Sequence, residues 1–344
     1  MNKIILFLFF VVFAVSCSDP DDGQTAYYLR GEGAFIINEG NFRWGNGSLS
    51  FYSYDSSRIY NAVFESVNGR PLGDVPFSMT QSEKSLFIVV NNSGKIEIAN
   101  TGTLRTSATI DSLVSPRFIC LINGSKAYVT SLYSDSLVIF NPSTARVTGF
   151  INLECTSESI IKTGDKVYVA NWSGGNELIV LDPLNDRISS RIEVGAEPES
   201  MVIDRDNGLW VLCSGGWSGD SMAELVRIDT ETDQVATRLV FPDRTHYPSS
   251  LNINKTGDTL YFIDNGVRRM SINDPGLPSV PFIEGDNHYF YRLAINNANG
   301  EIFVTDAVDF SSRGYVIRYD RRGELIEELE ADIIPGAVNF KYAN

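Results

Sequence analysis

The sequence has very little histidine: His246 and His288 are the only two in 344 residues. A metal centre built from several histidines, as in lactonase or quinoprotein sites, therefore cannot be assembled from this chain. The Gly-x-Ser-x-Gly motif that carries the nucleophilic serine of many hydrolases is also absent. We accordingly expect a protein that is not an enzyme and that uses no metal or cofactor.

Basic residues and cysteines are scarce as well. The chain has 28 Lys and Arg residues against 43 Asp and Glu residues, and its net charge of −15 excludes nucleic acid and anionic membrane surfaces as partners. Apart from Cys17 there are three cysteines, Cys120, Cys155 and Cys213, which lie in or beside apolar segments. Because three is an odd number, we expect these residues to be unbridged and to pack like small hydrophobic side chains.

Long apolar runs are missing after the first residues of the chain. The run Ile4–Val15 is too short to cross a bilayer and has the form of a signal peptide, which we expect to span residues 1–16. The sequence Ala-Val-Ser-Cys that ends at Cys17 resembles a bacterial lipobox, although Ala14 stands where Leu is usual. Cys17 is then the lipid-bearing first residue of the mature protein. A plain secretory signal followed by an incidental cysteine is the alternative.

Residues 17–32 are expected to form a polar tether. The stretch that follows Cys17 is acidic, with Asp19, Asp21 and Asp22. An acidic stretch in this place resembles the export signal that sends lipoproteins of Bacteroidetes to the outer face of the outer membrane. We therefore expect an outer-membrane protein that faces the cell exterior and contacts the membrane through its lipid alone.

The remaining chain, residues 33–344, repeats a unit of about forty residues. In its clearest copy, Ser115–Leu153, an extended opening is followed by three strand-like segments with Gly, Asn and Pro turns between them. One four-stranded sheet of this kind cannot bury both of its faces alone, so it must stack on copies of itself. Equivalent openings occur at Val75-Pro76, Ser115-Pro116, Ser157-Glu158, Glu197-Pro198, Tyr247-Pro248, Tyr291-Arg292 and Ile334-Pro335.

The two ends of the repeat region complement each other. The seventh opening has no strands after it, whereas Ala34–Ile37, Ser48–Tyr52 and Arg58–Phe64 are predicted to be second, third and fourth strands without a first. If Gly336–Phe340 supplies the missing inner strand, the ring closes and no sheet edge stays exposed. The sequence therefore predicts an all-β fold over residues 33–344: a single seven-bladed β-propeller of four-stranded antiparallel blades.

One face of this propeller attracts most of the unusual residues. Loops between second and third strands emerge on the same face as the loops that lead into the inner strands, and these loops hold both histidines and every tryptophan except Trp210, which we expect in the core. Aromatic rings interspersed with Asn, Gly and Ser suit a large, flat or ring-shaped ligand, although aromatic anchors also serve protein interfaces. The candidate ligand-binding residues are Asn38, Glu39, Phe42, Trp44, Asn91, Arg117, Tyr133, Trp172, Trp217, His246, Tyr247 and Phe310.

Structural explanations of these residues remain open. Each tryptophan could simply cover the end of its own blade, and the histidines could be polar rim residues. Asn38, Glu39 and Asn41 could close a tight loop through hydrogen bonds to the backbone.

Two sets of residues resemble known families. The segments Ala127–Ser131, Val167–Asn171 and Ile302–Asp306 resemble the Tyr-Val-Thr-Asn repeat of bacterial surface-layer-like propellers, a signal that is specific for the fold. The stretch Ile37–Phe42, followed by Asn46–Tyr52, resembles the surface lipoproteins of Bacteroidetes that sit on an outer-membrane TonB-dependent transporter and capture cobalamin. This second resemblance extends over essentially the whole mature chain.

The resemblance implies that the protein binds cobalamin or another corrinoid as a ligand, not a cofactor, and passes it to the transporter unchanged. A corrin ring has an apolar body and a rim of amide side chains, so aromatic anchors with Asn and Ser donors are suitable partners. Three rival functions are a glycan-binding lipoprotein, a protein-interaction module and a propeller lactonase or lyase. The enzyme is the weakest of these, because the chain lacks a convincing set of acid, base and metal ligands.

Overall fold

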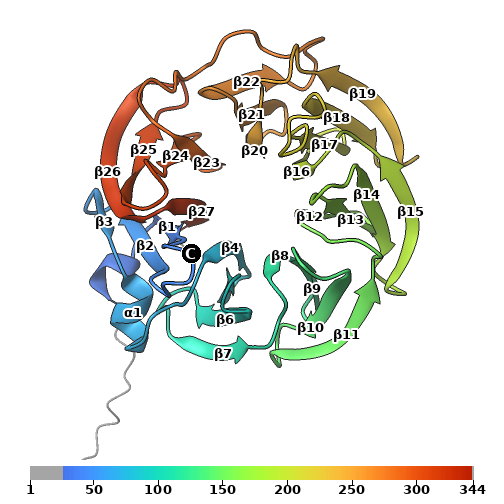
Figure 1. Ribbon diagram of the computed structural model, residues 1–344. Helices are drawn as coiled ribbons and strands as arrows, with labels where there is room; N and C mark the ends of the chain where they lie inside the picture. The colour runs from blue at the N-terminus through green and yellow to red at the C-terminus, as the bar shows by residue number, and fades with distance from the viewer. Residues whose placement is uncertain (1–25, 343–344) are drawn as a thin grey trace, which may run out of the picture.

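The computed structural model describes residues 26–342. Within this span the strands form seven antiparallel sheets, arranged as blades around a central axis (Figure 1). The predicted all-β seven-bladed propeller is therefore confirmed. The predicted signal peptide and the lipidation site Cys17 lie outside the described residues. Between residues 26 and 342, no helix is both long enough and apolar enough to cross a membrane.

Blades 1 to 4 each have four strands, which follow one another from the axis outwards. Blade 1 contains β27 (Pro335–Lys341), β1 (Gly33–Asn38), β2 (Ser48–Ser53) and β3 (Arg58–Tyr60). Blade 2 contains β4 (Pro76–Gln81), β5 (Ser85–Val90), β6 (Lys95–Asn100) and β7 (Thr106–Ile110). Blade 3 contains β8 (Pro116–Asn123), β9 (Lys126–Ser131), β10 (Ser136–Asn141) and β11 (Arg146–Asn152). Blade 4 contains β12 (Ile160–Thr163), β13 (Lys166–Asn171), β14 (Glu177–Asp182) and β15 (Arg187–Glu193).

The last three blades include the one departure from this pattern among the described residues. Blade 5 contains β16 (Pro198–Ile203), β17 (Gly208–Cys213), β18 (Glu224–Asp229) and β19 (Gln234–Val240). Blade 6 contains β20 (Ser249–Ile253), β21 (Thr259–Ile263) and β22 (Val267–Ser271). Blade 7 contains β23 (Phe290–Ile295), β24 (Ile302–Asp306), β25 (Arg313–Tyr319) and β26 (Leu325–Ile333). Residues 272–289 run irregularly outside β22, where a fourth strand of blade 6 would lie (Figure 1).

The ring is closed by pairing the two ends of the chain. The C-terminal strand β27 lies next to the axis and runs antiparallel to β1, with Ala34 opposite Phe340 and Ile36 opposite Val338 (Figure 1). This confirms the predicted closure through residues 336–340. Leu29, in the short 3-10 helix η1 (Tyr27–Leu29), is fully buried beside blade 1, so core contacts begin before residue 33.

The fourth strand of blade 1 is shorter than the sequence predicts. The sequence predicts this strand over Arg58–Phe64, but β3 ends at Tyr60 and the chain turns at Ala62, whose φ is 52°. The helix α1 (Val63–Asn68) then begins and buries Val63 and Phe64 under blade 1. The apolar residues read as a strand end are thus the buried face of a short helix.

The hydrophobic core is divided among the contacts between blades. Seven clusters of buried side chains occur in the described part of the chain, and each joins two adjacent blades. Alternate residues of a second strand point to opposite neighbours: Phe262 of β21 packs toward blade 5, whereas Tyr261 and Ile263 pack toward blade 7. This is why the second strands are apolar on both faces. Trp210 is buried in β17, and Cys120, Cys155 and Cys213 are unbridged, as predicted.

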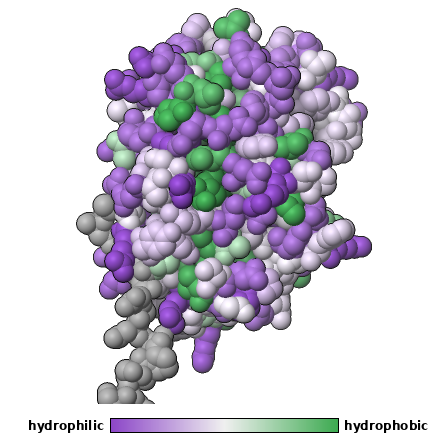
Figure 2. Space-filling view, turned by 90° about the vertical axis from the view of Figure 1, so that its left-hand side faces the viewer, coloured by the Kyte–Doolittle hydropathy of each residue, from purple (hydrophilic) through white to green (hydrophobic). Residues whose placement is uncertain are grey.

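The outer strands have the opposite character because one of their faces meets water. In β15 exposed residues alternate with partly or fully buried ones, and β19 shows the same alternation after three exposed residues at its start. Figure 2 views the molecule from the side on which blades 7 and 1 meet, where the surface is mainly hydrophilic with a narrow band of hydrophobic side chains.

The Tyr-Val-Thr-Asn repeat forms a polar clamp between neighbouring blades. In blade 3, Lys126 and the buried Tyr128 both donate hydrogen bonds to Asp186, which lies in the outer turn of blade 4. In blade 4, Lys166 and Tyr168 contact Asp233 of blade 5 in the same way, at 2.9 and 2.7 Å. Burial, and next the carboxylate of Asp186, raise the pKa of Tyr128, so its hydroxyl stays protonated as a donor.

Removing the clamp hydroxyl tests its contribution. Tyr128→Phe and Tyr168→Phe are each expected to lower the free energy of unfolding by about 1 kcal/mol, because each leaves a carboxylate without one donor. Urea unfolding followed by tryptophan fluorescence measures the loss. Tyr133→Phe is the matched control, since the Tyr133 ring is exposed and outside the clamp. Equal unfolding midpoints for all three variants and the wild type would contradict the role of the clamp.

A buried carboxylate predicts how stability depends on pH. Burial alone would raise the pKa of Glu97 in β6, but hydrogen bonds from Arg70 and Lys95 outweigh this effect and hold the pKa below its ordinary value. A depressed folded-state pKa stabilises the fold above the unfolded pKa of about 4.3. This contribution is lost as the pH falls through the folded-state pKa.

We expect the urea midpoint of the wild type to fall more steeply between about pH 5 and pH 3 than that of Glu97→Gln, which lacks the titrating group. The exposed Glu193→Gln serves as control and should follow the wild type. A Glu97→Gln variant with the wild-type slope in acid would refute this account.

Candidate ligand-binding site

One recurring backbone feature brings the loops of the predicted face together. In four blades the residue before the proline that opens the inner strand has a positive φ of 39–55°; these residues are Val75, Ser115, Glu197 and Ile334. The carbonyl of each accepts a hydrogen bond from the N–H just after the second strand of the same blade, from Asn91, Leu132, Ser214 and Glu39 respectively, at 2.8–3.1 Å. Lead-in loops and second-to-third-strand loops therefore lie on one face, as expected from the sequence.

A recess lies on this face above blade 6. The loop between β21 and β22 is only three residues long, Asp264–Gly266, and turns tightly with positive φ at Asn265 and Gly266. The corresponding loops of the flanking blades are longer and span residues 214–223 and 307–312. Because this loop is shorter than the loops on either side of it, a cavity of about 870 Å³ lies above it. This volume lies within the range of about 300–1,000 Å³ that is usual for small-molecule sites.

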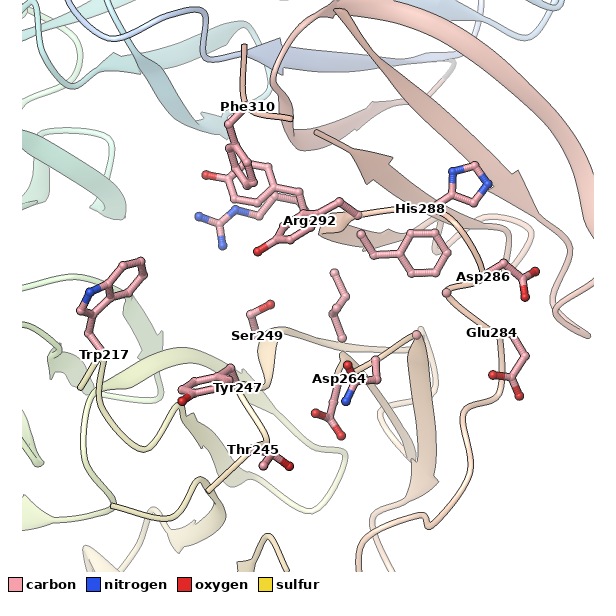
Figure 3. Close-up of a pocket in the computed structure, with 17 residues that line it drawn as sticks. Trp217, Thr245, Tyr247, Ser249, Asp264, Glu284, Asp286, His288, Arg292 and Phe310 are labelled. Atoms are coloured by element: carbon pink, nitrogen blue, oxygen red, sulfur yellow. The ribbon is translucent and has the colours of Figure 1, made fainter. Parts of the chain in front are cut away.

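The missing fourth strand of blade 6 supplies the outer wall of the cavity. Residues 272–289 form no fourth strand, but Ile283 makes an isolated antiparallel bridge with Val267 of β22. The segment that follows this bridge lies beside the cavity and places Glu284, Asp286 and His288 on its lining (Figure 3). The two carboxylate residues are exposed.

Aromatic rings from three blades wall the cavity. Trp217 of the blade 5 loop is 90% exposed, and the rings of Tyr247 and Tyr289 are each 57% exposed. Phe310 of the blade 7 loop packs edge-on against Tyr289, with their ring centroids 5.1 Å apart. In Figure 3, Trp217, Tyr247 and Phe310 stand around the open space. Exposed rings of this kind offer large contact areas for a flat ligand.

The two tyrosines are held by the two histidines through the same arrangement. His246 and His288 each precede one of the tyrosines, and each hydrogen-bonds through Nδ1 to an aspartate 18 residues later. The contacts are 2.9 Å from His246 to Asp264 and 2.7 Å from His288 to Asp306. Both aspartates lie at the end of a second strand. The His-Tyr pairs 246–247 and 288–289 are thus one structural unit repeated in neighbouring blades, with the histidine as anchor and the tyrosine in the cavity wall.

The inner wall, nearest the axis, is polar. Arg292 lies between Phe310 and Ser249 and donates from Nη1 to Glu199 at 2.9 Å (Figure 3). The neighbouring Tyr291 donates its hydroxyl to Glu39 at 2.8 Å. Burial raises the pKa of Glu39, and the charge of Arg292 and the Tyr291 hydroxyl partly offset this.

The structure brings some of the residues selected from the sequence together and separates others. Trp217, Tyr247 and Phe310 line the cavity, and His246 supports it through Asp264. Near the axis, Arg117 makes a bidentate contact with Glu158 and lies over a phenylalanine ring, so its charge is already paired.

The remaining candidates lie on the same face but outside this cavity. Asn38 is fully buried and donates to Ser48 and Ser50, and Asn91 donates to Ser115 and to the carbonyl of Pro116, so both amides are committed to the framework. Phe42, Trp44 and Tyr133 are exposed and Trp172 is half-buried, each on the loop of its own blade.

The cavity lining also contains residues that were not among the candidates chosen from the sequence, among them Glu284, Asp286, His288, Tyr289 and Arg292. A signal for two of them was present, because the His-Tyr dipeptide recurs 42 residues apart at equivalent positions of the repeat. Glu284 and Asp286 carry no such signal, since their place depends on the absence of a strand.

Comparisons of the fold find propellers with little sequence identity. A quinonprotein alcohol dehydrogenase-like protein from Bacteroides thetaiotaomicron VPI-5482 has a TM-score of 0.72 at 14% identity, with coverage of 91% of this chain and 78% of that one. The periplasmic gluconolactonase of Pseudomonas aeruginosa has a TM-score of 0.68 at 12% identity, with coverage of 91% and 100%. A functionally unknown protein from Desulfotomaculum acetoxidans DSM 771 has a TM-score of 0.70 at 11% identity, also with coverage of 91% and 100%. At these identities the likeness concerns the fold alone.

No curated protein matches the sequence. A family model described as a domain of unknown function, DUF5074, matches residues 32–335. The match starts just before β1 and ends at the first residue of β27, so it includes every strand of the propeller except β27. The chain therefore belongs to the DUF5074 family.

Proposed function

We propose that the protein captures a bulky, ring-bearing small molecule in the cavity above blade 6 and releases it unchanged, and that this ligand is cobalamin or another corrinoid. The observation that carries the proposal is the cavity itself, which is large, open and walled by exposed aromatic rings from three blades. A broad ligand can lie on these rings without being enclosed.

The polar groups of the cavity suit a ligand with a rim of amides. Primary amides donate N–H groups and accept through their carbonyls. The exposed carboxylates of Glu284 and Asp286 offer acceptors on the outer wall, and Arg292 offers donors on the inner wall. These groups lie on opposite sides of the aromatic surface (Figure 3), as the periphery of a macrocycle requires.

Capture without chemistry fits the way the titratable groups are used. The histidine ring nitrogens nearest Asp264 and Asp306 are bonded to these carboxylates, and the pairs fix the loops that carry Tyr247 and Tyr289. In the part of the chain that the structure describes, no group of three or more His, Cys, Asp and Glu side chains is arranged to hold a metal ion. We assign the pairs a positioning role.

The sequence features of the N-terminus complete the proposal. A lipid on Cys17 anchors the protein to the outer membrane with the propeller outside the cell, and an outer-membrane TonB-dependent transporter receives the ligand. The polar segment after Cys17 allows the propeller to extend away from the membrane surface.

Glycan binding is the second candidate, and one observation favours it. Trp217 is almost fully exposed beside the cavity, and carboxylates such as Glu284 accept hydrogen bonds from sugar hydroxyls. An aromatic ring of this exposure also stacks on the flat face of a sugar.

Titration with cyanocobalamin tests the proposal. Cyanocobalamin should bind the full-length protein in lipid nanodiscs with one-to-one stoichiometry and quench its tryptophan fluorescence. Calorimetry should give the same affinity. Trp217→Ala and Tyr247→Ala should each weaken binding about tenfold, because each removes an aromatic wall of the cavity. Trp44→Ala and Trp172→Ala are matched controls that should leave the affinity unchanged, since neither residue lines the cavity.

Three results would count against this proposal. Saturable binding of a soluble glycan that depends on Trp217, with none of cyanocobalamin, would establish the glycan function instead. Cyanocobalamin binding that depends on Trp44 or Trp172 would place the ligand elsewhere on the loop face. Absence of any small-ligand binding, with a protein partner retained through detergent extraction, would support an interaction module.

The lipid anchor has its own test. Cells grown with a radiolabelled or clickable fatty acid should label the wild-type protein, and Cys17→Ser should abolish the label, because Cys17 provides the acylated thiol and amino group. Fractionation should find the wild type in the outer membrane. Label on the Cys17→Ser protein would contradict anchoring at this residue.

A further inference from the structure

Some charged side chains around the cavity have an oppositely charged partner within the protein, and others do not. On the inner wall, Arg292 is paired with Glu199, and its neighbour Arg117 is paired with Glu158. At the short loop of blade 6, the Asp264 carboxylate lies 3.5 Å from Arg268 and 2.9 Å from His246. Each of these charges therefore has a partner within the protein.

The outer wall is different because its two carboxylates have no such partner. Among residues 26–342, neither Glu284 nor Asp286 makes an ion pair or a side-chain hydrogen bond within the protein. Both also line an adjoining cavity of about 370 Å³, to which Glu328 of β26 contributes a third carboxylate. With the net charge of −15, the outer wall therefore presents a negative potential to anything in the main cavity.

Aromatic rings face this potential across the same space. Trp217, Tyr247 and Tyr289 expose their rings to the cavity, and the faces of such rings attract cations. Carboxylates next to exposed aromatic rings form an environment that favours a positive charge and repels a negative one.

From this combination we infer that the cavity selects ligands that carry a positive charge, and that this charge lies against Glu284 and Asp286. The inference rests on the proposed function of the cavity as the ligand site and adds the chemical class of the ligand. A cobalt(III) corrin meets it at the metal centre, because cobalt(III), the singly negative corrin ring and one anionic axial ligand together leave a single positive charge there. An amino sugar meets it as well, whereas an acidic sugar does not.

A matched pair of small probes tests charge separately from the identity of the ligand. Benzyltrimethylammonium and benzylsulfonate have the same aromatic ring and opposite charges. Calorimetry with the full-length protein in zwitterionic nanodiscs, with empty nanodiscs subtracted, measures both. We expect the cation to bind and the anion to bind at least about tenfold more weakly, with the affinity for the cation falling as salt is raised.

The variants locate the charge effect. Glu284→Gln and Asp286→Asn should each weaken cation binding about twofold to fivefold, and the double variant about tenfold, as expected for exposed charges. Glu193→Gln, an exposed carboxylate on β15 of blade 4, is the control that should change nothing. Trp217→Ala should also weaken the binding of the cation, and this loss would show that the cation lies in this cavity.

The outcomes separate this inference from the proposed function. The charge selectivity is overturned if Glu284→Gln and Asp286→Asn leave cation binding unchanged, or if the anion binds as tightly as the cation. This holds even if cyanocobalamin binds. Cation selectivity that depends on these two residues, in a protein that does not bind cyanocobalamin, supports the inference and refutes the corrinoid ligand. If neither probe nor cyanocobalamin binds, both are wrong.

Discussion

No blade of this protein has a hydrophobic core of its own, and this constraint governs the rest of the structure. Each second strand is apolar on both faces and is buried only when a blade stands on either side of it. The polar clamp of Tyr128 and Asp186 acts at the same contacts and fixes how one blade sits on the next. Stability therefore depends on a closed ring, which the chain achieves by pairing β27 with β1.

The same constraint decides where variation is tolerated. Inner and second strands are fixed by their neighbours, whereas loops on one face and outer strands meet solvent on one side. Blade 6 departs from its neighbours in both places: its loop at Asp264–Gly266 is short and its fourth strand is missing. The first departure opens the cavity, and the second replaces a regular strand by the irregular segment that carries Glu284 and Asp286. The site thus arises from what blade 6 lacks.

The sequence predicts the parts of this protein that repeat. Strand positions, ring closure through residues 336–340 and the burial of Trp210 all follow from periodicity, because the same packing recurs in each blade. The end of β3 does not follow from the sequence, since the apolar residues after Tyr60 fit a strand and a short helix equally well. The cavity could not be located from the sequence because it depends on how the loops of neighbouring blades differ in length. No single repeat contains that information. Trp217 and Tyr247 were recognised as aromatic loop residues, but Trp44 has the same signature and lies elsewhere.

The closing pair of β1 and β27 joins residues that are some three hundred positions apart in the chain. Loop-closure entropy makes such a contact slow to form, and it cannot form at all before β27 has been synthesised. Until then β1 lacks its inner neighbour and exposes an unpaired edge, which is a site for aggregation. The order of synthesis therefore makes blade 1, the first to emerge, the last to be completed.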